Sequence, residues 1–132
     1  MREILFRGKR ADYGEWVEGY LIHYEYCNSH IPHIGHLVGD GVDVVEVDPS
    51  TVGQYTGLKD KNGKRIFEGD IVRMFLRDGT EDGKIFWSLA DARFKHLSPD
   101  ECGYGIDCTC NMEIIGNVHD FVQTRRADDA TN

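Results

Sequence analysis

Turn-forming residues recur along this chain at short intervals, which limits regular structure to short segments. The clearest turn covers residues 59–64, where Asn62 and Gly63 stand between two apolar runs. An Asn-Gly pair tolerates the positive φ angles of the type I′ turn that joins hairpin strands. Other turn signals occur at residues 11–14, 48–52, 68–70, 78–79 and 82–83. This spacing predicts a mainly-β fold of short strands with little helix, as in a small barrel or sandwich.

The runs between these turns have the composition of strands. Aromatic and β-branched residues on both sides of the turn at 11–14 predict an N-terminal hairpin. Further strands are expected at residues 42–47, 65–67, 71–76, 84–87 and 112–118, and residues 88–95 fit a helical turn or an irregular strand. Two polar stretches contain proline or glycine: residues 25–41 predict a loop or a hairpin tip, and residues 98–112 predict a loop.

The chain has 132 residues, which fits one domain. Six Phe, six Tyr and two Trp are enough to supply a packed core without a metal or disulfide. We expect a single β domain over residues 1–122. Residues 123–132 contain no apolar residue other than alanine, and we expect a disordered C-terminal tail there.

The formal net charge of −8 argues against nucleic acid as a partner. Binding a phosphate backbone normally requires a positive stripe on the protein surface. One local basic patch exists at the N-terminus, formed by Arg2, Arg7, Lys9 and Arg10. Such a run more commonly consists of solvated charges beside a strand. We therefore expect no appreciable binding to random duplex DNA at physiological salt.

No apolar run in the sequence approaches the length of a membrane span or of a signal-peptide core. We expect a cytoplasmic protein that does not enter a membrane. In that compartment the four cysteines should be reduced thiols or metal ligands rather than disulfides.

Thiol and imidazole side chains, the ligands that zinc favours, gather in the two predicted loops. The candidates are Cys27, His30, His33, His36, Cys102, Cys108 and Cys110. Neither loop contains a Cys-x-x-Cys pair, and Cys108 and Cys110 have a poor spacing for chelation. We therefore expect no stoichiometric zinc and no other cofactor, with these residues as weak candidates if zinc is found.

Carboxylates at turns are the other chemically suggestive feature. Glu68 and Asp70 flank Gly69, and Asp60 precedes the Asn62 turn. Paired acids can perform acid–base chemistry or bind a divalent cation. Aspartate is also a standard turn residue that accepts hydrogen bonds from its own backbone. Nucleophile-elbow, Walker and dinucleotide-binding motifs do not occur, so the chain is not expected to be an enzyme.

Phe86 and Trp87 are adjacent in an expected strand, where neighbouring side chains point to opposite faces. One of the two should then be exposed or lie at an interface. An exposed aromatic near an open strand edge favours pairing with another copy of the chain. We expect self-association or a protein partner at this surface. The alternative is a monomer in which the N-terminal hairpin covers both the edge and the aromatic residue.

Four segments of the sequence resemble the YopX family of phage and prophage proteins. They are residues 2–9 (REILFRGK), 14–21 (GEWVEGYL), 47–72 (VDPSTVGQYTGLKDKNGKRIFEGDIV) and 115–119 (IGNVH). The resemblance departs from the family over residues 25–41 and 98–112. It implies a phage or prophage origin and a small SH3-like β-barrel, to which the N-terminal hairpin would be added. It implies no catalytic residues.

Three functions are consistent with these features. The first, which the acidic charge and the missing catalytic motifs favour, is a small non-enzymatic protein-interaction module. The second is a nucleic-acid-associated accessory protein, which would require a basic, aromatic-lined patch. The third is a metal-dependent enzyme, which would require a bound metal with an open coordination position.

Overall fold

The computed structural model describes residues 3–23, 31–99, 103–107 and 110–120. The tail expected at 123–132 and four of the zinc candidates, Cys27, His30, Cys102 and Cys108, lie outside the described residues. The chain divides into two compact units, residues 1–55 and residues 56–132. Each unit is described by itself below.

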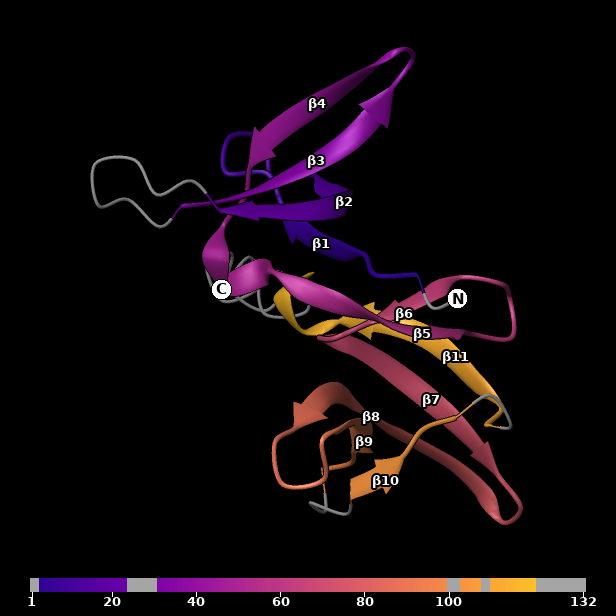
Figure 1. The fold of residues 1–132 in the computed structure, drawn as a ribbon. Helices are drawn as coiled ribbons and strands as arrows, with labels where there is room; N and C mark the ends of the chain where they lie inside the picture. The colour runs from indigo at the N-terminus through magenta and orange to yellow at the C-terminus, as the bar shows by residue number, and fades with distance from the viewer. Residues whose placement is uncertain (1–2, 24–30, 100–102, 108–109, 121–132) are drawn as a thin grey trace, which may run out of the picture. The chain divides into compact units, whose positions relative to one another are not determined.

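The first unit is an antiparallel sheet built around the predicted N-terminal turn. Strand β1 (Phe6–Lys9) pairs with β2 (Trp16–His23), β2 with β3 (Pro32–Val38), and β3 with β4 (Gly41–Glu46). The 3-10 helix η2 (Pro49–Thr51) leads into β5 (Gly53–Lys59), whose first residues pair with β1. The order β4–β3–β2–β1–β5 leaves β4 at the end of this sheet (Figure 1).

Alternation along these strands gives the sheet one buried face. Ile34, Val45 and Val47 form its core, each with 8% or less of its surface exposed. Phe6, Val17, Leu21 and Val52 pack against them. Gly8 lies over this core, where an added Cβ would meet the Val47 side chain at 3.0 Å. Among the described residues, the opposite face carries no such core. The candidate site described below lies beside that uncovered face.

Strand β3 corrects part of the prediction of a loop or hairpin tip over residues 25–41. Within that stretch, Pro32–Val38 pairs with β2 on one side and β4 on the other. The histidines and the proline obscured a strand pattern, in which Ile34 is fully buried. Proline is compatible with the first position of a strand, because the ladder bond to Val47 N–H needs only the Pro32 carbonyl.

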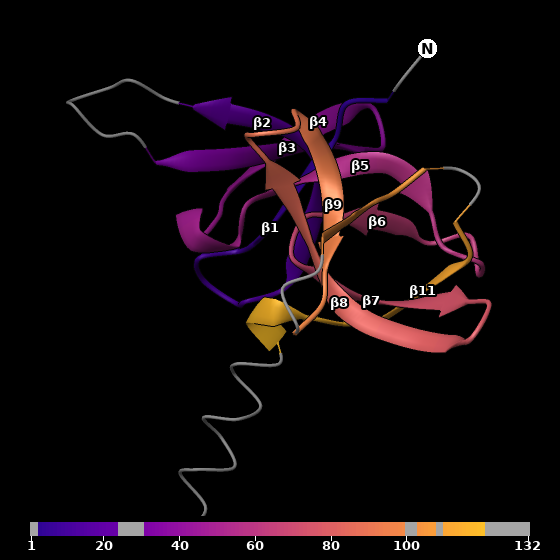
Figure 2. The ribbon, with the colours of Figure 1, turned by 90° about the horizontal axis from the view of Figure 1, so that it is seen from below.

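The second unit contains the end of β5 and six further strands. They are β6 (Arg65–Phe67), β7 (Asp70–Leu76), β8 (Gly79–Ser88), β9 (Arg93–Leu97), β10 (Gly103–Gly105) and β11 (Met112–Asn117). The last five form an antiparallel sheet in the order β10–β9–β8–β7–β11, with β7 between β8 and β11 (Figure 2). Its core consists of Ile66, Val72, Met74, Ile85, Ile106 and Met112.

The turn between β5 and β6 lies where Asn62 and Gly63 predicted it, but its type differs. Gly63 has a φ of +83°, whereas Ala92 is the only described non-glycine residue with a positive φ. Gly63 N–H bonds to the Asp60 carbonyl, and Asp60 N–H bonds to the Lys64 carbonyl. This is the three-residue hairpin loop in which a left-handed glycine follows a type I turn, rather than a type I′ turn.

The mainly-β prediction is confirmed, but the expected SH3-like barrel is not closed. The five-stranded sheet has two ends, β10 and β11. Strand β10 is only three residues long and two of them are glycines, so it offers little to a further strand. Within the described part of the chain, no helix combines the length and apolarity needed to cross a bilayer.

Candidate functional site

The described zinc candidates do not come together. His33 and His36 lie on β3, three residues apart, so their side chains point to opposite faces of the sheet. Nδ1 of His33 is 3.1 Å from the Ile31 carbonyl, and Nε2 of His36 is 3.8 Å from a carboxylate oxygen of Asp43. Cys110 belongs to the second unit and is a free thiol. Among the described residues, no group of three or more His, Cys, Asp or Glu side chains is arranged to hold a metal ion.

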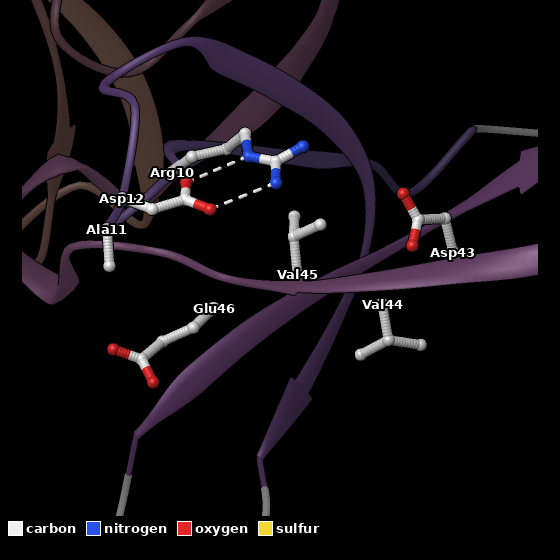
Figure 3. Close-up of a pocket in the computed structure, with 7 residues that line it drawn as sticks. All are labelled: Arg10, Ala11, Asp12, Asp43, Val44, Val45 and Glu46. Atoms are coloured by element: carbon white, nitrogen blue, oxygen red, sulfur yellow. Dashed lines mark hydrogen bonds and ion pairs between the residues drawn. The ribbon is translucent and has the colours of Figure 1, made fainter.

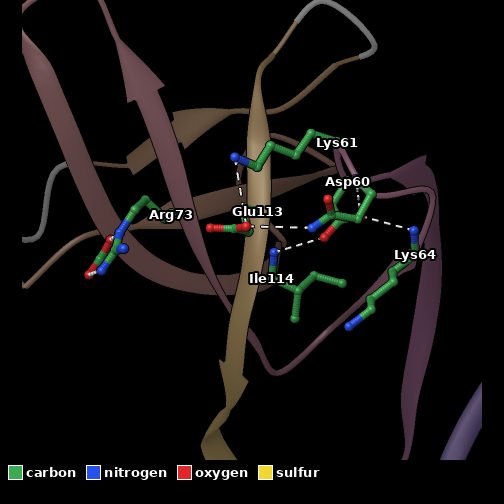
Figure 4. Close-up of polar contacts among 8 residues, drawn as sticks. Asp60, Lys61, Lys64, Arg73, Glu113 and Ile114 are labelled. Atoms are coloured by element: carbon green, nitrogen blue, oxygen red, sulfur yellow. Dashed lines mark hydrogen bonds and ion pairs between the residues drawn. The ribbon is translucent and has the colours of Figure 1, made fainter.

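Backbone N–H groups bind both carboxylate oxygens of Asp60. Asp60 is buried, and its Oδ1 accepts from the N–H groups of Asn62 and Lys64. Its Oδ2 accepts from Ile114 N–H (Figure 4). Burial raises the pKa of Asp60, but these backbone donors outweigh burial and leave the pKa below its usual range. Asp60 therefore ties the hairpin turn to β11.

Asp70 has a similar structural role at the next turn. Its side chain is fully buried, and its Oδ2 accepts from Phe67 N–H at 2.8 Å. Its Oδ1 accepts from the Asn117 side-chain amide at 3.3 Å. These contacts join the turn before β7 to the end of β11, within the second unit.

The aromatic pair on β8 divides as strand alternation requires. Trp87 is 43% exposed, while Phe86 is half-buried. The Trp87 ring contacts Phe94 of β9 edge to face, with 4.9 Å between ring centroids. Trp87 therefore has a packing partner in its own unit but retains an exposed surface.

A groove of about 510 Å³ in the first unit is the strongest candidate site (Figure 3). Its walls are the turn that follows β1 and the last four residues of β4. The lining residues are Arg10, Ala11, Asp12, Asp43, Val44, Val45 and Glu46. Sequence reasoning placed a strand at 42–47 but did not identify it as the wall of a groove.

Arg10 and Asp12 form a two-pronged ion pair at one end of this groove. Nε and Nη2 of Arg10 donate to the two carboxylate oxygens of Asp12 at 3.0 and 3.1 Å. The hydrogen bond from Arg10 lowers the pKa of Asp12 to about 2, and the Asp12 contact raises the pKa of Arg10. Both groups are therefore charged at neutral pH, and they face each other at the end of the groove.

The groove runs along an open sheet edge. Val47 N–H donates to the Pro32 carbonyl. Because backbone groups alternate in direction along an antiparallel strand, Val45 and Asp43 also direct their N–H and C=O groups toward β3. The alternate residues, Val42 and Val44, direct their N–H and C=O groups away from β3. At Glu46 the outward carbonyl accepts from Ala11 N–H, which closes that end of the edge. In the described part of the chain, no strand pairs with the outer side of β4 at Val42 and Val44.

Apolar side chains lie exposed beside this edge. The strand registers place Tyr20, Leu37, Val42 and Val44 on the face opposite the core. Tyr20, Leu37 and Val42 each have more than 60% of their surface exposed. An added Cβ at Gly35, in the middle of this face, would lie 2.9 Å from Ile22 and 3.5 Å from Val42. The face therefore presents exposed apolar side chains from β2 to β4.

These features define a mainly-β protein with an acid-lined groove along an open strand. The family model described as YopX protein matches residues 5–121, and the chain belongs to the YopX family. A solved structure, protein EF1440 from Enterococcus faecalis, is similar with a TM-score of 0.49 and 23% sequence identity. That match covers 90% of this chain and 95% of the other. The comparison with curated proteins found no match.

Proposed function

We propose that this chain is a non-enzymatic protein-interaction module that holds a segment of a partner protein along β4. The observation that carries the proposal is the open edge, where Val42 and Val44 present outward backbone groups beside a groove. Natural proteins usually cover, shorten or charge such an edge, because it is a template for pairing with another chain. A partner segment in extended conformation can add to it as a further strand.

The surroundings of the edge support this proposal. Four successive residues from Gly41 to Val44 are exposed, so the edge is reachable over a useful length. The turn at Arg10 and Asp12 gives the groove a defined end, which fixes where an added strand must stop. A non-enzymatic role is supported by Asp60 and Asp70, whose oxygens bind backbone and side-chain donors of their own unit.

Two other parts of the proposal rest on the sequence. We propose a phage or prophage origin on the family resemblance alone. Action in the cytoplasm remains a prediction from the sequence. A relation of the second unit to SH3-like small barrels is also proposed, on its succession of short antiparallel strands.

The test replaces Val44 with proline, which removes a backbone N–H that points away from β3. Peptides are selected by display on the immobilised full-length chain, and their affinity is then measured for Val44→Pro and for Val44→Thr. Threonine keeps the backbone donor, so we expect Val44→Thr to retain binding and Val44→Pro to lose at least about tenfold. Peptides that bind both variants equally would contradict the proposal. Circular dichroism and urea unfolding establish that each variant is folded.

A further inference from the structure

We infer that the occupant of the β4 edge is an extended peptide in which basic and aliphatic side chains alternate. A lysine or arginine would lie between Asp12 and Asp43 on one face, and aliphatic side chains would lie beside Val42 and Val44 on the other. This inference rests on the proposed function and specifies the chemistry of the partner.

The two faces of the edge differ in kind, as Figure 3 shows. Asp43 and Val45 point to the same side of β4 as the pair formed by Arg10 and Asp12, whereas Val44 and Glu46 point to the other side. Side chains of an added strand alternate between the same two sides. One set would therefore meet Asp12 and Asp43, and the other set would meet the apolar face of Val42 and Val44.

The charge of the groove selects a cation. Three of its lining residues are carboxylates, Asp12 and Asp43 on one side of β4 and Glu46 on the other, and Arg10 is the single cation among the lining residues. Arg10 already donates two hydrogen bonds to Asp12, so the groove keeps a negative excess. A carboxylate can accept further hydrogen bonds from a lysine or guanidinium group, and such charge-assisted bonds are stronger than neutral ones.

The same charges argue against a second copy of the chain as the occupant. If β4 paired with its own copy with Val44 opposite Val44, each Asp43 would lie opposite Val45 and diagonal to the other Asp43. Both copies would also bring Asp12 and Glu46 to the contact, and each chain carries a net charge of −8. Like charges at this distance oppose pairing, whereas a basic peptide satisfies the same carboxylates.

The experiment compares three fluorescent peptides with identical neutral flanks, measured by anisotropy with the full chain at about 150 mM salt. One has a lysine-valine alternation, the second has glutamate in place of lysine, and the third has the lysines and valines of the first in two blocks. We expect the alternating basic peptide to bind best, because only it matches both faces of the edge. The blocked peptide controls for attraction by net charge alone.

Substitutions then locate the contact. We expect Asp43→Asn to weaken the alternating basic peptide by about tenfold, and Asp43→Lys to shift the preference toward the glutamate peptide. Asp78→Asn makes the same charge change at an exposed turn of the second unit, and we expect it to leave affinity unchanged. The basic and acidic peptides could instead bind the wild type equally, with Val44→Pro abolishing the binding of both. That result would overturn the inference but leave the proposed function intact.

Failure of the proposed function has a different result. Binding of all peptides that is insensitive to Val44→Pro would show that the edge is not the site, and both proposals would fall. Light scattering of the wild type and of Val44→Pro then measures the oligomeric state. A dimer that Val44→Pro dissociates would identify a second copy as the occupant of the edge. It would overturn the inference that the occupant is a basic peptide.

Discussion

Val44 and Val72 occupy the middle of similar valine-containing strands, yet their environments are opposite. Val72 lies in β7, between β8 and β11, and is fully buried in the core of the second unit. Val44 lies in β4, at the end of its sheet, and is 37% exposed. Position within the sheet, rather than residue type or strand propensity, decides which valine stabilises the fold and which is available to a partner.

The polar groups of the two units follow the same division. In the second unit, Asp60, Asp70 and Asn117 are buried and bind groups of neighbouring strands. In the first unit, the carboxylates of Asp12 and Asp43 remain on the exposed rim of a groove. Polar side chains therefore fasten the second unit internally, while those of the first unit are placed where a ligand can reach them.

Proline at each of the two valines should give the largest contrast. In Val72→Pro, a central strand loses a ladder hydrogen bond and must accommodate the ring between two neighbours, so we expect a loss of about 3 kcal/mol or more. In Val44→Pro, the missing N–H points outward, so we expect a change within about 1 kcal/mol. Urea unfolding measures both. Equal losses would show that the outer side of β4 is also paired in solution.

The buried carboxylate of Asp60 should show a smaller but pH-dependent effect. Asn can accept at only one oxygen and turns an N–H group toward a backbone donor, so Asp60→Asn should cost about 1–3 kcal/mol at pH 7. Because the folded pKa of Asp60 is lowered, its contribution is present above the unfolded pKa near 3.9 and is lost as pH falls through the folded pKa.

Unfolding curves between about pH 2 and pH 7 test this sign. We expect the variant to lose less stability on acidification than the wild type, although Asp12, Asp82 and Asp91 also have lowered pKa values and still contribute. Asp78→Asn provides the control at an exposed turn. Parallel pH curves for Asp60→Asn and the wild type would mean that Asp60 is not the acceptor of these backbone bonds in solution.

The sequence was informative where local chemistry decides structure. Asn62 and Gly63 marked a real hairpin turn, and the alternation at 42–47 marked a real strand. It failed where distant pairing decides: Pro32–Val38 became a strand because β2 and β4 provide partners on both sides. The candidate site was missed for the same reason. Nothing in residues 42–47 distinguishes an end strand from a central one, since that property belongs to the order of the sheet.

Removing the ion pair between Arg73 and Asp82 should change stability less than Val72→Pro or Asp60→Asn. The two residues face each other on β7 and β8, and Nε and Nη2 of Arg73 donate to the carboxylate at 2.8 and 3.1 Å. Their hydrogen bond raises the pKa of Arg73 and lowers that of Asp82. However, the side chains are 40% and 43% exposed, so water and salt screen their attraction.

We therefore expect Arg73→Met to move the urea midpoint by less than about 0.5 M. The methionine retains an aliphatic stem of similar length, so the measured change isolates the charged contact. Combining Arg73→Met with Asp82→Asn should show weak coupling in low salt and none in about 1 M salt, where the screening length is about 3 Å. A strong coupling that survives high salt would mean that this pair fastens β7 to β8 as Asp60 fastens the turn to β11. The stability of the second unit would then depend on exposed charges as well as buried ones. Exposed charges would no longer distinguish the first unit from the second.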